Sequence, residues 1–295
     1  MPFPDYDEPV FRPPSEADSL IVQLTLGCSH NRCVFCPMYK SKRFRLRPVT
    51  DIARELAALP SRFREQTRRV FIADGDALTA PMGHLVELLD LLAVALPALT
   101  RVGIYASPAS LRGKTVAELA LLRDKRLRIL YFGLESGDDA TLASMRKGAT
   151  AAEMLTLCDQ AQAAGLKLSV TAILGLGGQQ RSRQHAEATG AWVSQLSPAY
   201  FSLLTLIPSP ELAALAGFTP LTNGGVLEEI ALLLPTLQPQ RTILRSNHGS
   251  NLLQLAGNLP RDRERLIAEC AQALTAARRH PDWYHRCSTE TVRGL

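Results

Sequence analysis

The chain has 295 residues, of which 46% are hydrophobic and 21% charged, and its mean hydropathy is zero. Apolar content this high and charge this low exclude a mainly disordered chain and predict a folded globular protein. The most apolar window, residues 85–99, is interrupted by Glu87, Asp90 and Pro97, so it falls short of the ~20 apolar residues of a membrane helix. The first twenty residues are acidic and rich in proline, unlike a secretory signal peptide. We therefore expect a cytoplasmic protein without membrane contact.

The charge of the chain leaves its partner open. The formal net charge is +5, the pI is about 9.0, and only six of the 33 basic residues are lysines. A modest excess of this kind does not establish a nucleic-acid partner. Three of the six cysteines stand alone, whereas the other three lie close together at Cys28, Cys33 and Cys36. In a reducing compartment this uneven pattern favours a metal or redox site over a disulfide framework.

Apolar runs alternate with helical patterns from residue 20 to residue 207. The predicted strands are residues 20–26, 69–73, 101–106, 128–134, 167–174 and 200–207. The predicted helices are residues 50–59, 83–96, 116–123, 150–164 and 182–196. Thr50 is the predicted N-cap of the first helix. Strands that alternate with helices of this length predict right-handed βαβ units and a parallel sheet. Six such units predict an α/β fold, namely a partial (β/α)6 TIM-type barrel.

The pattern changes after Pro210. We expect a loop at residues 211–223, a helix at 225–234, a seventh strand at 242–246 and a closing helix at 260–279. The chain is thus predicted to comprise an N-terminal extension (1–19), the barrel (20–210) and a C-terminal helical extension packed on the barrel (211–295). Each polar or glycine-rich motif follows directly on a predicted strand. Because parallel barrels build active sites at the carboxyl ends of their strands, this agreement predicts an enzyme.

The three clustered cysteines follow the first predicted strand. An iron–sulfur cube normally takes four cysteines, so the trio Cys28, Cys33 and Cys36 would leave one iron open to an exogenous chelator. The alternative is a structural zinc site with His30 as the fourth ligand. Such a site would suit a zinc-stabilised nucleic-acid-binding module without catalysis. The spacing of the cysteines alone leaves both possibilities open.

The cysteine segment resembles the signature of the radical S-adenosylmethionine (radical SAM) superfamily, Cys-x3-Cys-x2-Cys with an aromatic residue before the last cysteine. Phe35 occupies the aromatic position, although four residues separate Cys28 from Cys33 in this chain. The resemblance implies that Phe35 faces the adenine of SAM, the alternative being plain core packing. The segment Asp74-Gly75-Asp76 lies where the superfamily carries a Gly-Gly-Glu motif that holds the amino group of SAM. Two of its three residues differ, so the resemblance implies that backbone carbonyls supply most of that contact.

Two further motifs occur in the order of the superfamily. Residues 131–137, followed by 145–148, are similar to the fourth-strand motif of the coproporphyrinogen-dehydrogenase and methylthiotransferase branches. That similarity implies that Glu135 and Ser136 contact the ribose and methionine ends of SAM. Residues 171–178 resemble the fifth-strand adenine-binding segment and imply cofactor contacts at Ile173 and Gly175. The resemblance covers roughly residues 20–210.

The resemblance implies a [4Fe–4S] cluster whose open iron binds the amino and carboxylate groups of SAM. One-electron reduction would then cleave SAM to a 5′-deoxyadenosyl radical that abstracts a hydrogen atom from a substrate. An electron donor such as flavodoxin or ferredoxin is the implied partner. The similarity to the porphyrin branch favours a small-molecule substrate, while the arginine-rich loops permit an RNA-modifying enzyme. The sequence does not identify the substrate.

The stretch 245–251, Arg-Ser-Asn-His-Gly-Ser-Asn, is polar and lies outside the barrel motifs. We expect His248 and Asn251 to contact substrate at the barrel mouth. The alternative is a polar turn whose side chains satisfy their own backbone.

Other polar and sulfur-containing residues have less specific expectations. The basic run 40–47 suits either an anionic ligand or a solvated loop edge. His185 is expected on a solvated helix face, the alternative being a place at the rim of the barrel. Cys158 and Cys270 lie in predicted helices, where cysteine usually behaves as a small apolar residue. We therefore expect no second cluster.

Overall fold

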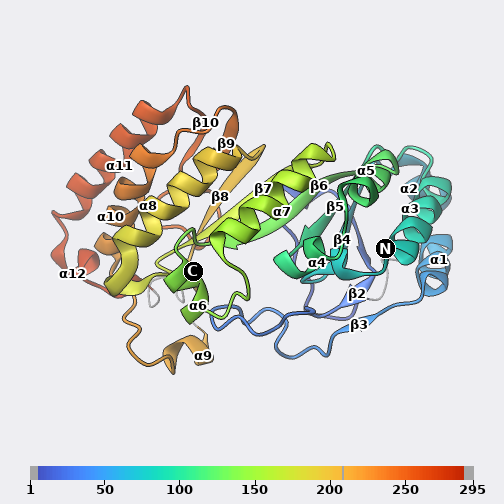
Figure 1. Ribbon diagram of the computed structural model, residues 1–295, viewed down its shortest axis with the longest axis horizontal. Coiled ribbons are helices and arrows are strands. Elements are labelled where there is room, and N and C mark those ends of the chain that lie inside the picture. The colour runs from blue at the N-terminus through green and yellow to red at the C-terminus, as the bar shows by residue number, and fades with distance from the viewer. Residues whose placement is uncertain (1–5, 208, 289–295) are drawn as a thin grey trace. The chain divides into compact units, whose positions relative to one another are not determined.

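The computed structural model describes residues 6–207 and 209–288 (Figure 1). It has a mixed α/β fold with a mostly parallel eight-stranded sheet in the order β1-β4-β5-β6-β7-β8-β9-β10 and a two-stranded sheet, β2-β3. This confirms the predicted α/β class. Among the described residues, no helix combines the length and the apolar character needed to cross a membrane.

The chain divides into two compact units. The first comprises the described part of Met1–Asn31 with Cys36–Phe132 and Leu157–Leu168, and the second comprises Arg32–Phe35, Gly133–Thr156 and the described part of Ser169–Leu295. Strand β6 (Leu127–Glu135) and helix α7 (Ala151–Ala163) each contribute residues to both units.

The first unit contains parallel strands of the large sheet and the antiparallel pair β2-β3. Its strands are β1 (Leu20–Gln23), β2 (Thr25–Leu26), β3 (Arg45–Leu46), β4 (Arg69–Ala73), β5 (Arg101–Ala106) and most of β6. Its other helical elements are η1 (Pro14–Glu16), α1 (Val49–Ala58), α2 (Ser61–Gln66), η2 (Ala77–Thr79), α3 (Met82–Ala95), α4 (Pro108–Arg112) and α5 (Val116–Asp124). Strand β4 pairs in parallel with β1 and β5, and four of its five residues are buried. A near-continuous apolar run is typical of such a strand, because both of its faces are covered.

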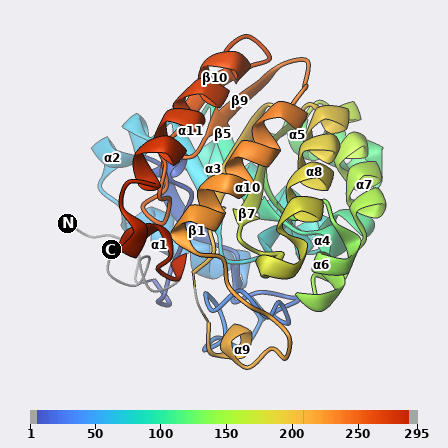
Figure 2. The same ribbon diagram turned by 90° about the vertical axis from the view of Figure 1, so that its left-hand side faces the viewer.

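The second unit continues the alternation. Its strands are β7 (Lys167–Leu174), β8 (Tyr200–Thr205), β9 (Thr242–Arg245) and β10 (Ala256–Leu259). Its other helices are α6 (Asp139–Ser144), α8 (Gly178–Leu196), α9 (Pro210–Ala213), α10 (Asn223–Thr236), α11 (Arg263–Ala277) and α12 (Pro281–Tyr284). Strands β7, β8 and β9 are parallel, and β10 is antiparallel to β9. Helix α10 packs against both α8 and α11, as Figures 1 and 2 show.

The structure differs from the predicted elements at a few places. The first predicted strand is divided, because β1 joins the large sheet whereas β2 pairs antiparallel with β3. The prediction of Thr50 as an N-cap is wrong, since α1 begins one residue before it and Pro48 occupies the cap position in extended backbone. Strand β10 was not predicted. Its sequence, Ala-Gly-Asn-Leu, has little apolar alternation and becomes a strand by pairing with β9.

Candidate active site

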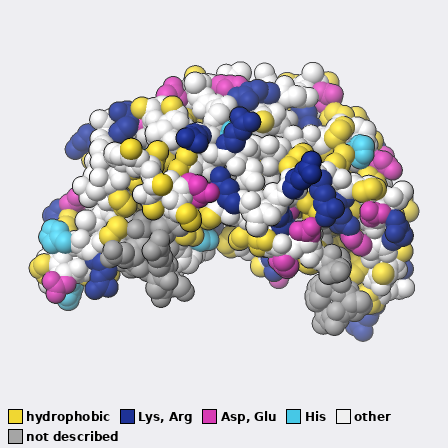
Figure 3. Space-filling model, turned by 90° about the horizontal axis from the view of Figure 1, so that it is seen from below, with side chains coloured by type: hydrophobic (Ala, Val, Ile, Leu, Met, Phe, Trp, Pro, Cys, Tyr) yellow, Lys and Arg dark blue, Asp and Glu magenta, His cyan; other side chains and the backbone are white. Residues whose placement is uncertain are grey.

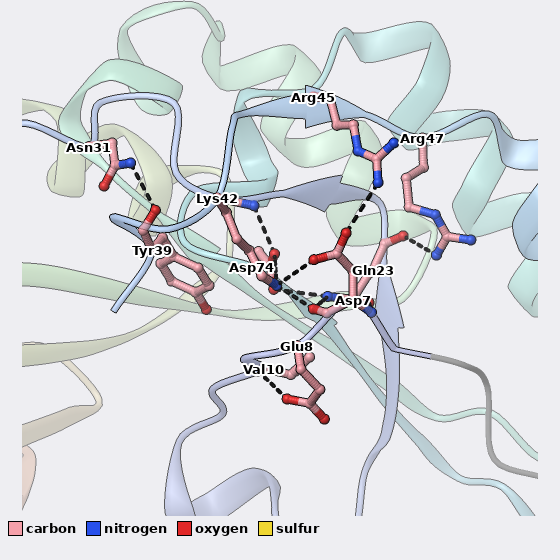
Figure 4. A network of polar contacts seen from close by, with 11 residues as sticks. Asp7, Glu8, Val10, Gln23, Asn31, Tyr39, Lys42, Arg45, Arg47 and Asp74 are labelled. Carbon is pink, nitrogen blue, oxygen red and sulfur yellow. Dashed lines mark hydrogen bonds and ion pairs between the residues drawn. The ribbon is translucent and has the colours of Figure 1, made fainter. Parts of the chain in front are cut away.

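Asp74 follows β4 directly and is fully buried. Its Oδ2 atom accepts a hydrogen bond from the Gly27 backbone N–H (2.8 Å) and pairs with Lys42 Nζ at 3.1 Å. Its Oδ1 atom accepts from Gln23 Nε2 at 3.2 Å (Figure 4). Both carboxylate oxygens are therefore used inside the protein. Through Gly27 and Lys42, Asp74 holds the two ends of the loop that carries the cysteines.

Lys42 belongs to the basic run 40–47 but points inward. Its side chain is only 5% exposed, and its ammonium group donates to the Asp7 carbonyl as well as to Asp74 (Figure 4). Removing one partner of a buried ion pair leaves a desolvated charge. Lys42 thus neither faces solvent nor offers its charge to a ligand, unlike the exposed Lys40, Arg43 and Arg45 of the same run.

The cysteine loop lies closely against Gly75. A Cβ atom at Gly75 would be 2.8 Å from Cys28 Cβ and 2.8 Å from Tyr39 Cδ2, so a larger residue would displace the loop. The Gly75 N–H also donates to the Gly27 carbonyl at 3.2 Å. Burial raises the pKa of Tyr39 far above its usual range, and the neighbouring Tyr105, Asp74 and Cys36 raise it further.

The candidate cluster ligands are distributed over the two units. Cys28 and Cys36 belong to the first unit, and Cys33 belongs to the second, together with the buried Phe35. All three cysteines are partly exposed. Among the residues that the structure describes, no three His, Cys, Asp or Glu side chains are gathered closely enough to hold one metal ion.

Asp76 differs from Asp74 in its hydrogen bonding. It is fully buried, and its Oδ2 atom accepts from the hydroxyls of Ser29 and, at 2.7 Å, Ser107. Its Oδ1 atom is buried and has no hydrogen-bond partner among the described residues. Burial lowers the pKa of nearby Lys114, and the Asp76 charge opposes that shift. A buried carboxylate oxygen without a donor is unfavourable, so Asp76 Oδ1 is suited to accept from an N–H or O–H group of a ligand.

Glu135 ends β6 in an unusual backbone conformation. Its φ is +67°, in the left-handed region that few non-glycine residues adopt. Its carboxylate pairs with Lys147 Nζ at 2.9 Å, and both side chains are nearly buried. A Cβ atom at Gly133 would be 1.9 Å from Glu135 Oε1, so a larger residue there would require the Glu135 carboxylate to move. Backbone strain of this kind is concentrated at functional sites.

Ser136 is fully buried after the same strand, and its Oγ lies 2.8 Å from His185 Nδ1. The expectation that His185 lies on a solvated face is wrong, because only 2% of the residue is exposed. Helix α8 begins at Gly178, four residues before the predicted start, and packs against α10.

The turn after β7 is fixed by a residue that the sequence analysis missed. Gly175 has φ +82°, and its N–H donates to Glu229 Oε1 at 2.6 Å, while Ile173 is half-buried within β7. Glu229 is buried in α10. Its helical spacing from the buried residues Val226 and Leu233 was the available signal, since it places Glu229 on the apolar face.

The polar stretch 245–251 has hydrogen-bond partners both within itself and on strand β8. Asn251 Nδ2 donates to the Leu203 carbonyl at 2.7 Å, and its Oδ1 accepts from the Thr205 hydroxyl at 3.1 Å. His248 Nδ1 lies 2.8 Å from Ser250 Oγ, and burial lowers the pKa of His248. Asn251 is thus held by strand β8, whereas the contact of His248 with Ser250 follows the polar-turn alternative. Contact of either residue with substrate stays a prediction.

The isolated cysteines Cys158 and Cys270 are buried, which confirms their expected place in the core. Burial raises the pKa of the Cys270 thiol to about 11.

Comparison of the sequence with models of known protein families shows which family the chain belongs to. The model of the radical SAM superfamily matches residues 22–187, more than half of the chain. The chain belongs to the radical SAM superfamily. It is therefore an enzyme of a superfamily that cleaves SAM reductively with a [4Fe–4S] cluster. This membership sets aside the alternative of a module without catalysis. No curated protein matches the sequence.

Solved structures of radical SAM proteins share the fold. Coproporphyrinogen III oxidase (HemN) from Escherichia coli has a TM-score of 0.57 and 16% identity, covering 74% of this chain and 52% of its own. HydG, a maturase of the [FeFe]-hydrogenase, has a TM-score of 0.53 and 15% identity, covering 84% of this chain and 54% of its own. Methylornithine synthase (PylB) has a TM-score of 0.54 and 15% identity, covering 85% of this chain and 68% of its own. This chain thus spans about half the length of HemN and HydG. The likeness confirms the partial TIM-type barrel.

Proposed function

We propose that Cys28, Cys33 and Cys36 each bind one iron of a [4Fe–4S] cluster and that SAM binds the fourth. Their spacing, the aromatic Phe35 and the family signature support these ligands, because soft thiolates suit iron–sulfur centres. The close approach of Gly75 to Cys28 supports a place for the cluster loop at the end of β4. The same three thiols suit a reducing compartment such as the cytoplasm.

The observation that carries the SAM assignment is the open Oδ1 atom of Asp76. It is a buried acceptor at a strand end, and the ammonium group of SAM is a positively charged hydrogen-bond donor that can pair with it. Glu135, Ser136, Ile173 and Gly175 are proposed to contact the rest of SAM. Asp74 is proposed to act indirectly, since its oxygens are occupied by Gln23, Gly27 and Lys42.

When bound and reduced, the cluster and SAM together supply a 5′-deoxyadenosyl radical that abstracts hydrogen. The residues of this chain do the remaining work, which is to orient SAM and keep water away from it. Ser136 and Asp76 are fully buried, and Phe35 is a buried aromatic residue. The electron is proposed to come from a separate donor such as flavodoxin or ferredoxin.

We further propose a small-molecule substrate. HemN and PylB are described as a coproporphyrinogen oxidase and a methylornithine synthase, which act on small molecules. On the face shown in Figure 3, basic side chains are scattered among acidic and apolar ones instead of forming one continuous patch. A nucleic-acid-binding surface usually carries clustered positive charge. Turnover of an RNA, and of no small molecule, would overturn this part of the proposal.

The experiment compares Asp76→Asn with the wild type after reconstitution with iron and sulfide without oxygen. The variant keeps the shape of the side chain but removes its charge, so we expect unchanged iron content and SAM binding weakened about tenfold or more. Ser107→Ala, which removes one neighbour of Asp76 but not its charge, is the matched control with a smaller loss. Equal SAM affinity in Asp76→Asn and the wild type would contradict the assignment. A colourless protein that holds one zinc ion would contradict the cluster itself.

A further inference from the structure

A buried chain of polar groups in the second unit joins the loop after β6 to the turn after β7. Ser136 Oγ lies 2.8 Å from His185 Nδ1, and His185 Nε2 lies 3.6 Å from Glu229 Oε1. The same Glu229 oxygen accepts from the Gly175 N–H at 2.6 Å. Ser136, His185 and Glu229 are each at most 2% exposed. Ser136 and Gly175 are both proposed SAM contacts, whereas His185 and Glu229 are not among them.

Glu229 acts as an acceptor at both of its oxygens. Its Oε2 atom accepts from the Ser182 hydroxyl at 2.6 Å, while Oε1 accepts from Gly175. Burial raises the pKa of Glu229, whereas His185 and the hydrogen bonds from Ser182 and Gly175 favour its charged form. A carboxylate held in that form favours a proton on the ring nitrogen of His185 that faces it. In a neutral imidazole one nitrogen donates and the other accepts. With its proton on Nε2, a neutral His185 has Nδ1 as the acceptor, and the Ser136 hydroxyl then donates to it.

This direction determines what Ser136 can offer to a ligand. In that tautomer its hydroxyl proton is directed to His185, while its oxygen accepts from the Asp138 N–H at 3.0 Å. The remaining group on Ser136 Oγ is a lone pair. Ser136 is thus set to accept a hydrogen bond from a ligand and not to donate one.

We propose that His185 and Glu229 are positioning residues that orient Ser136 as an acceptor for a hydroxyl or ammonium group of SAM, and not for its carboxylate. The inference rests on the proposed function, in which Ser136 contacts SAM. Through Gly175, the same Glu229 holds the turn at which SAM is also proposed to bind. One buried carboxylate, Glu229, thereby contacts the turn at Gly175 and also faces the histidine that orients Ser136, both within the second unit.

The first test reads the protonation of His185 without cluster or SAM. Nitrogen-15 NMR of the cluster-free protein, labelled at histidine and assigned with the His185→Asn variant, distinguishes the two neutral tautomers and the imidazolium. We expect the neutral form with its proton on Nε2. A proton on Nδ1, whether in the other tautomer or in the imidazolium, would overturn the proposal.

The second test uses two amide replacements of His185. In His185→Asn the amide lies near the position of Nδ1 and keeps a partner for Ser136, whereas in His185→Gln it extends to the position of Nε2. We expect His185→Asn to bind SAM within about threefold of the wild type and His185→Gln to bind about tenfold more weakly, the effect of one lost hydrogen bond. A role in packing alone predicts similar losses, and that result, or the reverse order, would overturn the proposal.

A double-mutant cycle removes the effect of general destabilisation. In a Ser136→Ala background, His185→Gln should weaken SAM binding no further, because its effect passes through Ser136. If the losses in SAM affinity of the two single variants simply add in the double variant, His185 does not act through Ser136 and the proposal is contradicted. If the wild type holds its cluster but does not bind SAM, the proposed function fails. The tautomer of His185 seen by NMR still decides which way the hydrogen bond between Ser136 and His185 points.

Discussion

Two carboxylates that lie two residues apart at the end of β4 have different roles. Asp74 is saturated by partners from the N-terminal part of the chain, whereas Asp76 keeps one buried oxygen open. The sequence predicts that both lie at the active edge of the barrel. It does not distinguish them, because their partners, such as Lys42 and Ser107, come from about 30 residues away in the chain.

At the same scale, Gly133 has a testable role beneath the pair of Glu135 and Lys147. Gly133→Ala would place a Cβ atom 1.9 Å from Glu135 Oε1 and force the carboxylate away from Lys147. We expect the free energy of unfolding to fall by about 1 kcal/mol, because moving the Glu135 side chain weakens its ion pair with Lys147. Denaturant unfolding measures this change.

Gly83→Ala is the matched control, since an added Cβ atom there meets nothing within 4 Å. Gly83 lies in α3, so alanine should stabilise the protein by about 0.5–1 kcal/mol. Equal effects of the two substitutions would contradict the role given to Gly133.

At the scale of elements, α8 holds the loop that follows β6. Arg181 near the start of α8 makes two hydrogen bonds of 2.7 Å to Asp138, which also caps α6. The Arg181 guanidinium is the main reason that the pKa of Asp138 is lowered to about 2. A carboxylate with a lowered pKa in the folded state stabilises the protein at neutral pH and loses that effect in acid.

The variant Asp138→Asn tests this contact, because asparagine caps a helix as well as aspartate does. After allowance for solvent screening, the wild type should be about 1 kcal/mol more stable than the variant near pH 7. This difference should be full above pH ~4, the usual pKa of aspartate, and should shrink as the pH falls toward about 2. Chemical denaturation from pH 7 to pH 3 measures it.

Glu187→Gln serves as the control, because the ion pair of Glu187 with Arg183 is exposed. It should change stability little at any pH. A difference between wild type and Asp138→Asn that stayed constant with pH would contradict the assignment of the lowered pKa to Arg181.

The local hydrophobic pattern of the sequence predicts most helices and strands, but it does not predict which elements pack or pair with one another. Strands β4, β5 and β7 have the predicted bounds, because buried parallel strands appear as continuous apolar runs. Strand β10 was missed because its pairing with β9 outweighs its weak pattern. His185 was misplaced for a similar reason, since its burial depends on α10, which lies about 40 residues later in the chain.

At the scale of the whole molecule, binding of SAM should stabilise the fold by mass action. With the cluster in place and free SAM at ~100 times its dissociation constant, the wild type should gain about 2.7 kcal/mol. At the same SAM concentration, a variant with tenfold weaker binding, as expected for Asp76→Asn, should gain about 1.4 kcal/mol. Thermal unfolding with and without SAM measures both. Equal gains would show that Asp76 does not contribute to SAM binding.

The family could be predicted from the sequence, because four motifs keep their order and their places after strands, and residues 22–187 match the superfamily. The substrate could not. It depends on side chains that differ among enzymes of one fold, and fold alone does not specify function.

The measurement that tests the three-cysteine cluster most directly is the yield of 5′-deoxyadenosine from SAM. Wild-type protein, Cys33→Ala and the control Cys287→Ala, which alters the third isolated cysteine of the chain, are reconstituted without oxygen, reduced chemically and incubated with SAM. We expect 5′-deoxyadenosine from the wild type and the control, and none above background from Cys33→Ala. Production by Cys33→Ala at the wild-type rate, or none by a wild type that holds its full complement of iron and sulfide, would contradict the assignment.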